Sequence, residues 1–148
     1  APAFFTRFRR RGPGAIMRVM RIWLFLAGIN GALAVALGAW AAHGLEGAAA
    51  DVHAWMEKAT RYHLIHALAL FGVGMMRGAG LLAAAWARAA GGLFFAGIVL
   101  FCGTLYGLAF TAGAFPAAPA PVGGTAFILG WLALAGAAVA DPRNKPSV

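Results

Sequence analysis

All four histidines of the chain lie between positions 43 and 66, in the stretch HGLEGAAADVHAWMEKATRYHLIH. Three of the four acidic residues, Glu46, Asp51 and Glu57, lie in the same stretch. Imidazole and carboxylate groups carry protons and bind metal ions in proteins. The sequence on either side is apolar over membrane-spanning lengths. The stretch is therefore either a functional site or the aqueous connection between two membrane helices.

Within this stretch we predict one candidate polar cluster. An ionisable residue inside a membrane span indicates a functional role. His66 fits best, because it lies about one turn inside an apolar run and has Tyr62 one turn away on the same face. Proton or quinone handling is one interpretation, and a neutral His66 that bonds a neighbouring helix is the other. The full cluster comprises His43, Glu46, Tyr62, His63 and His66.

Two cofactors can be compared with these residues. Three histidines with a carboxylate suit zinc, and His43 with His63 on facing helices is an arrangement that suits haem. However, the sequence has no His-Glu-x-x-His spacing, and His43 and His66 need not lie at the same depth. We therefore predict neither a metal nor a cofactor.

Catalytic motifs are absent from the sequence. The only serine is Ser147 near the end of the chain, and there is no Gly-x-Ser-x-Gly. Gly123-Gly124 is not followed by the lysine of a phosphate-binding loop. A single cysteine, Cys102, excludes an internal disulfide framework. We predict that the protein is not an enzyme.

The composition indicates what surrounds the cluster. Of the 148 residues 62% are hydrophobic and 11% are charged, whereas soluble domains have about 25% charged residues. The sequence therefore predicts an all-α, polytopic membrane protein. The net charge of +8 does not indicate nucleic-acid binding, because most arginines lie next to an apolar span, where they set topology and attract anionic lipids.

Four apolar stretches predict four transmembrane helices, at about 22–42, 61–77, 89–110 and 123–140. Apolar residues at helical spacing predict a short amphipathic helix over 48–60, at the membrane interface between spans one and two, with Trp55 at headgroup depth. Residues 1–21 are predicted to be a basic cytoplasmic segment, and residues 141–148 a cytoplasmic tail.

Small residues predict where the helices pack closely. Asn30, Ala34 and Gly38 recur every four residues on one face of the first span, and an amide in lipid is expected to bond a neighbouring helix. Gly103 and Gly107 form a Gly-x-x-x-Gly in the third span.

The basic residues predict the orientation. With the N-terminus in the cytoplasm, ten lysines and arginines lie inside and only Lys58 and Arg61 lie outside. We predict a bacterial inner membrane with both termini cytoplasmic, the mitochondrial inner membrane being the alternative. The N-terminal arginines are predicted to bind anionic lipid or a protein partner: Arg7, Arg9, Arg10, Arg11, Arg18 and Arg21.

Four segments occur in a characteristic order along the spans: GAWAAHGL, WMEKATRYHLIHALAL, FCGTLY and PVGGTAFILGWLAL. Together they resemble the domain-of-unknown-function family 423, which includes the transmembrane protein 256-like proteins of animals, over about residues 22–140. The resemblance implies a small four-helix inner-membrane protein, mitochondrial in animals, and it implies no activity.

Two functions remain open from the sequence. The first is a non-catalytic accessory subunit that packs against a larger membrane protein complex, which the missing catalytic motifs and the small-residue faces favour. The alternative is an ion-, proton- or quinone-linked membrane protein that uses His43, His63 and His66.

Overall fold

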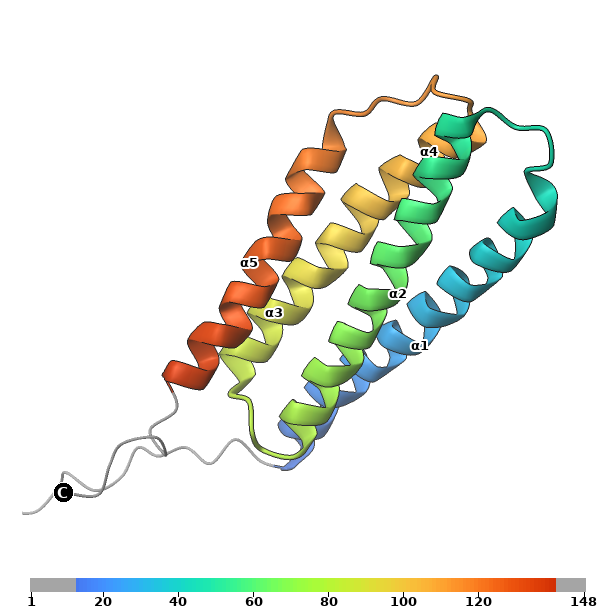
Figure 1. Ribbon diagram of the computed structural model, residues 1–148. Coiled ribbons are helices and arrows are strands. Elements are labelled where there is room, and N and C mark those ends of the chain that lie inside the picture. Colours follow the sequence, from blue (N-terminus) through green and yellow to red (C-terminus); the bar gives the residue numbers. More distant parts are fainter. Residues whose placement is uncertain (1–12, 141–148) are drawn as a thin grey trace, which may run out of the picture.

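A computed structural model describes residues 13–140 of the chain, and these form an antiparallel helical bundle (Figure 1). The predicted all-α class is confirmed. The helices, in chain order, are α1 (Pro13–Gly44), α2 (Ala50–Gly78), α3 (Ala84–Gly97), the π-helical segment η1 (Ile98–Cys102), α4 (Gly103–Phe110) and α5 (Pro119–Val139).

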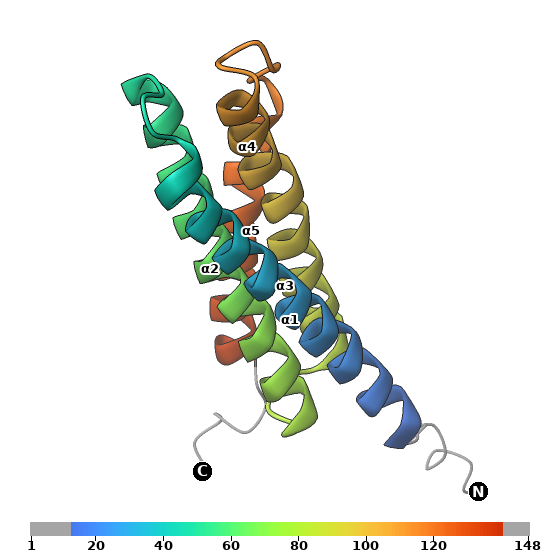
Figure 2. The same cartoon turned by 90° about the vertical axis from the view of Figure 1, so that its right-hand side faces the viewer.

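The elements α3, η1 and α4 continue into one another, so the bundle consists of four rods (Figure 1). α1 packs mainly on α2, α5 packs mainly on α3 and η1, and α2 lies against the rod that α3, η1 and α4 form. In the second view α1 crosses the bundle obliquely (Figure 2). We call the end where α1 and α3 begin and α2 and α5 end the basic end, and the opposite end the mixed-charge end.

Three of the helices are long and apolar enough to cross a membrane by length and composition: Gly14–Gly44, Ala84–Phe110 and Pro119–Val139. α2 has 29 residues, so it is about 44 Å long at 1.5 Å per residue. Its first half contains Asp51, Glu57, Lys58 and Arg61, which lower its hydropathy below that of the other three. α2 therefore matches the other rods in length but not in composition.

The prediction of a separate interfacial helix over 48–60 is wrong. Residues 50–60 belong to α2, which continues without interruption to Gly78. The buried positions run along one face of the whole helix, from Val52 through Met56 and Ala59 to Leu70. A helix at an interface would need to turn before entering the membrane, but this continuous buried face packs against the same neighbours throughout.

Besides α2, three helices begin earlier than the spans predicted for them. α1 begins at Pro13 rather than near residue 22, α3 begins at Ala84 rather than near residue 89, and α5 begins at Pro119 rather than at Gly123. Proline is tolerated in the first turn of a helix because the N–H groups there have no intrahelical acceptor. Hydropathy locates the apolar part of a rod, whereas helix geometry continues through Arg18 and Arg21.

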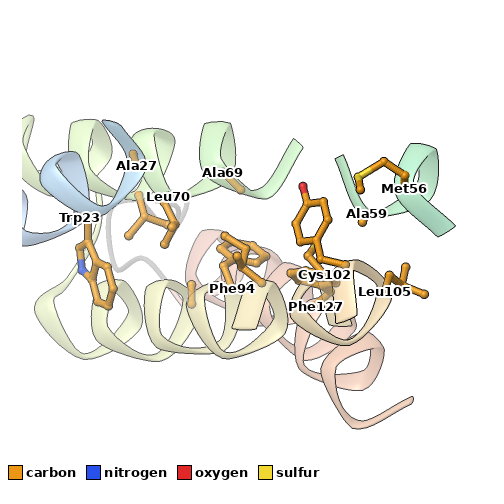
Figure 3. Packing of buried hydrophobic residues seen from close by; sticks show 14 of the residues in the cluster. Trp23, Ala27, Met56, Ala59, Ala69, Leu70, Phe94, Cys102, Leu105 and Phe127 are labelled. Atoms are coloured by element: carbon orange, nitrogen blue, oxygen red, sulfur yellow. The ribbon is translucent and has the colours of Figure 1, made fainter. Parts of the chain in front are cut away.

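The core runs the length of the bundle (Figure 3). Phe94, Met56, Leu70, Val73 and Cys102 are its largest fully buried side chains. The outer surface is also apolar: Phe25, Leu68, Val122 and Ile128, from α1, α2 and α5, are each more than 60% exposed. A perimeter of this kind suits a lipid environment or a partner of the same character.

Glycines allow the rods to approach one another closely, but these glycines are not the predicted Gly103 and Gly107. A Cβ at Gly103 would have no neighbour within 4 Å, and one at Gly107 would meet only the ring of Phe115 in the following loop. The prediction that these two form a close helix–helix contact is therefore wrong. The closest approach is at Gly123 of α5, where a Cβ would overlap the backbone nitrogen of Phe101 in η1.

Candidate functional site

Two buried histidines of α2, His63 and His66, face the interior of the bundle less than one turn apart. His63 joins three rods. Its Nε2 lies 3.0 Å from Oδ1 of Asn30 on α1, and its Nδ1 lies 3.2 Å from the hydroxyl of Tyr106 on α4. Asn30 is 7% exposed and His63 is 4% exposed, so this network lies out of contact with the surroundings.

The partners of Asn30 determine the direction of every hydrogen bond in this network. Nδ2 of Asn30 donates to the carbonyl of Leu26 at 2.7 Å, so Oδ1 is the atom that faces His63. Oδ1 can only accept, so Nε2 of His63 carries the proton and donates. In the neutral ring Nδ1 is then an acceptor, and it receives the hydroxyl proton of Tyr106. In this series of hydrogen bonds, from the Tyr106 hydroxyl through His63 and Asn30 to the Leu26 carbonyl, every polar side-chain atom has a partner.

His66 has the opposite tautomer. Its Nδ1 lies 2.8 Å from the carbonyl of Tyr62 one turn earlier, and a carbonyl can only accept, so Nδ1 carries the proton. Nε2 accepts from the indole N–H of Trp131 on α5 at 3.2 Å. Both nitrogens of His66 are therefore also satisfied when the ring is neutral.

The two rings differ in whether they can hold a second proton. On His63 a second proton would lie on Nδ1 and face the Tyr106 hydroxyl. That hydroxyl can rotate so that its oxygen accepts a hydrogen bond from Nδ1–H. On His66 a second proton would lie on Nε2 and face the indole N–H of Trp131, which has no lone pair to offer. The hydrogen-bond geometry therefore allows a proton to be added at His63 and opposes it at His66.

Aromatic rings enclose His66. Phe127 of α5 stacks on the imidazole with ring centroids 3.5 Å apart and planes at 13°. Tyr62, Phe94 and Trp131 lie with their centroids 5.6 to 6.1 Å from that of His66. Phe127 reaches this position across Gly97 of α3, where any Cβ would overlap the ring. The π-helical segment η1 follows Gly97 directly, and such segments are frequent at functional sites.

The predicted cluster is divided by the fold. His43 and Glu46 are exposed at the mixed-charge end, whereas His63 and His66 are buried in the bundle. Asn30, which contacts His63, lies thirteen residues before His43 on the same helix, about 20 Å along its axis. His43 and His63 therefore cannot be ligands of one haem or one metal ion.

No group of three or more histidine, cysteine, aspartate or glutamate side chains converges anywhere within residues 13–140. His63 and His66 do not line the hollow beside residues 14–26 of α1, the hollow between α1 and α3, or the hollow beside Gly38 and Thr60. Both ring nitrogens of each buried histidine have a hydrogen-bond partner within the bundle.

The remaining predicted site residues lie as follows. Ala34 and Gly38 face α2 together with Asn30, and a Cβ at Gly38 would contact Thr60 at 3.9 Å. Arg18 and Arg21 are exposed on the first turns of α1. The other four N-terminal arginines, Arg7, Arg9, Arg10 and Arg11, lie outside the described residues.

Four residues of this site were not among the predicted ones: Phe94, Tyr106, Phe127 and Trp131. Tyr106 is one of only two tyrosines in the chain and the only one in the third span, and a lone hydroxyl in an apolar span is a signal that a hydrogen-bond partner is near. The indole N–H of Trp131 is a signal of the same kind, whereas Phe94 and Phe127 have no polar atom and are ordinary residues of apolar helices.

The relatives that comparison with known proteins finds include bacterial membrane proteins. A family described as "Protein of unknown function (DUF423)" matches residues 37–124. The UPF0382 membrane protein YwdK of Bacillus subtilis is 43% identical over 122 residues, which cover 81% of this chain and 98% of that protein. A UPF0382 membrane protein of Staphylococcus epidermidis is 43% identical over 117 residues, 78% of this chain and 93% of its own length.

No solved structure matches the chain. The match to residues 37–124 includes both buried histidines, Tyr106 and Gly123. The resemblance drawn from the four sequence segments is confirmed, and the chain belongs to the DUF423 family of membrane proteins of unknown function.

Proposed function

We propose that this protein is a non-catalytic accessory subunit that packs through α1 against another membrane protein. The observation that carries the proposal is a second small-residue stripe on α1. Gly28, Ala32 and Ala36 recur every four residues and are all exposed. They lie on the side of the helix opposite Asn30, Ala34 and Gly38, which face α2, because a shift of two residues rotates the position by about 200°.

Small residues four apart are the usual means by which membrane helices approach one another, since lipid supplies no hydrophobic drive for association. On α1 the inward stripe is used by the bundle itself. The outward stripe meets nothing: a Cβ at Gly28 would have no neighbour within 4 Å among the described residues. A partner helix that lies along this stripe would contact the α1 backbone closely.

The interior supports a structural role. All four imidazole nitrogens of His63 and His66 have partners inside the bundle. A catalytic or transport site needs a polar group that is free to meet its substrate, and these histidines instead join helices to one another.

The membrane placement belongs to the same proposal. α2 crosses as a fourth span, because it packs against α1 and along the rod of α3, η1 and α4, and its buried histidines are shielded from lipid (Figure 1). Both termini face the cytoplasm of a bacterial inner membrane, since Arg18, Arg21, Arg77 and Arg88 gather at the basic end. The mitochondrial inner membrane is the alternative. Labelling of single cysteines placed at the two ends in Cys102→Ala cells tests this orientation.

The packing proposal is tested by mild solubilisation of the native membrane and size analysis of the complex that contains the chain. We expect Gly28→Leu to release the chain from its complex, because leucine blocks the outward stripe. Gly103→Leu is the matched control, since Gly103 is also an exposed helical glycine with open space around it. If the wild-type chain runs alone, or both variants behave as wild type, the accessory role is wrong.

A second candidate function, proton-linked activity, is favoured by one observation. The Tyr106 hydroxyl can reverse its hydrogen bond and so allow His63 to take up a proton between three rods. Proteoliposomes that contain a pH-sensitive dye test it: His63→Leu should abolish a proton flux that His66→Leu retains. Absence of any flux with the wild-type chain rejects this candidate and leaves the accessory role unaffected.

A further inference from the structure

The two ends of the bundle differ in their charge balance. The described acidic residues, Glu46, Asp51 and Glu57, all lie at the mixed-charge end, where Glu57 pairs with Arg61. At the basic end Arg18, Arg21 and Arg88 are exposed, and within residues 13–140 none of them has an acidic partner. Arg77 differs from these three, because it is buried and donates to the carbonyl of Leu82 at 3.1 Å.

A hollow of about 310 Å³ opens between α1 and α3 at this end, lined by Val19, Ile22, Trp23 and Arg88. Its inner limit is the contact between Trp23 and Gly91, where a Cβ on the glycine would lie 2.5 Å from the indole. Arg88 precedes Gly91 by one turn of α3, so its guanidinium lies on the side of this contact nearer the basic end.

A second hollow, of about 540 Å³, adjoins the first at Ile22 and follows the face of α1 that contains Met17, Arg18, Arg21 and Phe25. The two hollows together place an apolar surface beside three unpaired guanidinium groups. The hollow between α1 and α3 is almost entirely apolar in its lining, whereas the charges lie toward the end of the helices.

We propose that this cleft binds one anionic phospholipid. Arg18, Arg21 and Arg88 hold the phosphate, and an acyl chain occupies the hollow against Val19, Ile22 and Trp23. Guanidinium groups bind phosphate oxygens by charge-assisted hydrogen bonds, and basic pockets between membrane helices bind lipid headgroups in this way. The apolar hollow selects a lipid over a free anion, because a free phosphate would leave it unfilled.

This proposal rests on the membrane placement proposed above, but it is independent of any protein partner. The sequence predicted lipid binding by the N-terminal arginines alone, and this proposal adds an arginine from a second rod. Arg88, on α3, completes the site.

The test uses the purified full chain in detergent micelles, with native mass spectrometry to count bound lipid. We expect one phosphatidylglycerol to be retained at concentrations where phosphatidylcholine with the same acyl chains is not. The double variant Arg21→Gln/Arg88→Gln should weaken retention by about thirtyfold, because each arginine contributes about 1 kcal/mol and about 1.4 kcal/mol is a factor of ten. Arg61→Gln, which removes an exposed arginine from the mixed-charge end, is the matched control and should bind as wild type.

Two further measurements distinguish lipid binding in the hollow from non-specific attraction of anionic lipid to the arginines. Ile22→Trp fills the hollow without a change in charge and should reduce retention, and excess inorganic phosphate should not displace the lipid. The proposal is overturned if Arg61→Gln weakens binding as much as the double variant, if Ile22→Trp binds as wild type, or if phosphate alone displaces the lipid. Unfolding midpoints in sodium dodecyl sulfate confirm that each variant is folded.

Discussion

His63 and His66 lie on the same face of α2, yet they form two different kinds of site. His63 bonds side chains of α1 and α4 and so joins three rods. His66 bonds a carbonyl of its own helix and an indole of α5, and it is stacked under Phe127. The first is a junction of polar groups, and the second is an imidazole in an aromatic enclosure.

This difference shows that residue type and depth do not decide what a buried histidine does. The partners decide it, because an amide and a hydroxyl leave His63 able to exchange its donor and acceptor roles, whereas a carbonyl and an indole leave His66 one arrangement only. The sequence ranked His66 as the better candidate for proton handling, and the hydrogen-bond geometry favours His63 instead.

The largest expected effect comes from separating α5 from the rest of the bundle. Gly123→Ala places a methyl group against the backbone of Phe101, which cannot move as a side chain can, and we expect a loss of about 3 kcal/mol in the free energy of unfolding. Titration with sodium dodecyl sulfate in mixed micelles measures it. Gly103→Ala, which meets open space, should stay within about 0.5 kcal/mol of wild type. Equal effects would contradict the position of α5 that builds the His66 enclosure.

The next effect tests the junction. His63→Leu removes both hydrogen bonds and leaves Asn30 and Tyr106 without partners in the interior, so we expect about 2 kcal/mol of destabilisation in the same assay. Asn30→Leu combined with His63→Leu should cost less than the sum of the two single changes, because both variants remove the same bond. Additive losses would show that the two residues are not coupled.

A smaller loss is expected at the second histidine. His66→Leu keeps an apolar side chain under Phe127 and removes one bond to the backbone and one to the partly exposed Trp131, so about 1 kcal/mol should be lost. A loss larger than that of His63→Leu would reverse the comparison between the two sites.

Tyr106→Phe should have a still smaller effect, below about 1 kcal/mol, because it removes a single hydrogen bond and retains the ring. The change leaves Nδ1 of His63 without its donor and should not affect His66. Unfolding of Tyr106→Phe alone and in the His63→Leu background measures the coupling, and equal costs in both backgrounds would contradict the bond.

The last prediction concerns which imidazole nitrogen carries the proton and involves no change in stability. In the folded protein, nitrogen-15 spectra of the two imidazoles should show the proton on Nε2 of His63 and on Nδ1 of His66. Identical tautomers would contradict the opposite hydrogen-bond directions at the two rings. His63→Gln and His66→Gln assign the two signals.

Much of the fold follows from the sequence by simple physical reasoning. Long apolar runs require helices in a membrane, since each backbone polar group must be satisfied within its own segment. The four rods, the position of Asn30 toward a neighbouring helix and the family were all predicted correctly. The extent of each rod was less accurate, because hydropathy does not report where helix geometry ends, as Arg18, Arg88 and the first half of α2 show.

The candidate site was predicted only in part. His63, His66 and Tyr62 are neighbours on one helix, and spacing is enough to group them. His43 was grouped with them because it is near in sequence, yet it lies near the end of α1, about 20 Å along that helix from Asn30, which contacts His63. The Gly-x-x-x-Gly pair failed for a related reason, since a small residue permits close packing but does not place a helix beside it.

By itself, the sequence determined that this chain forms apolar helices, which of their residues are small, and that all four histidines lie in one segment of the chain. Only the tertiary structure decided that Tyr106 and Asn30 meet His63, that Trp131 and Phe127 enclose His66, and that Arg88 lines a hollow with Ile22 and Trp23 of α1. The physical reason is that helical periodicity assigns each residue to a face, whereas the choice of the facing rod and its axial offset depends on the packing of all four rods together.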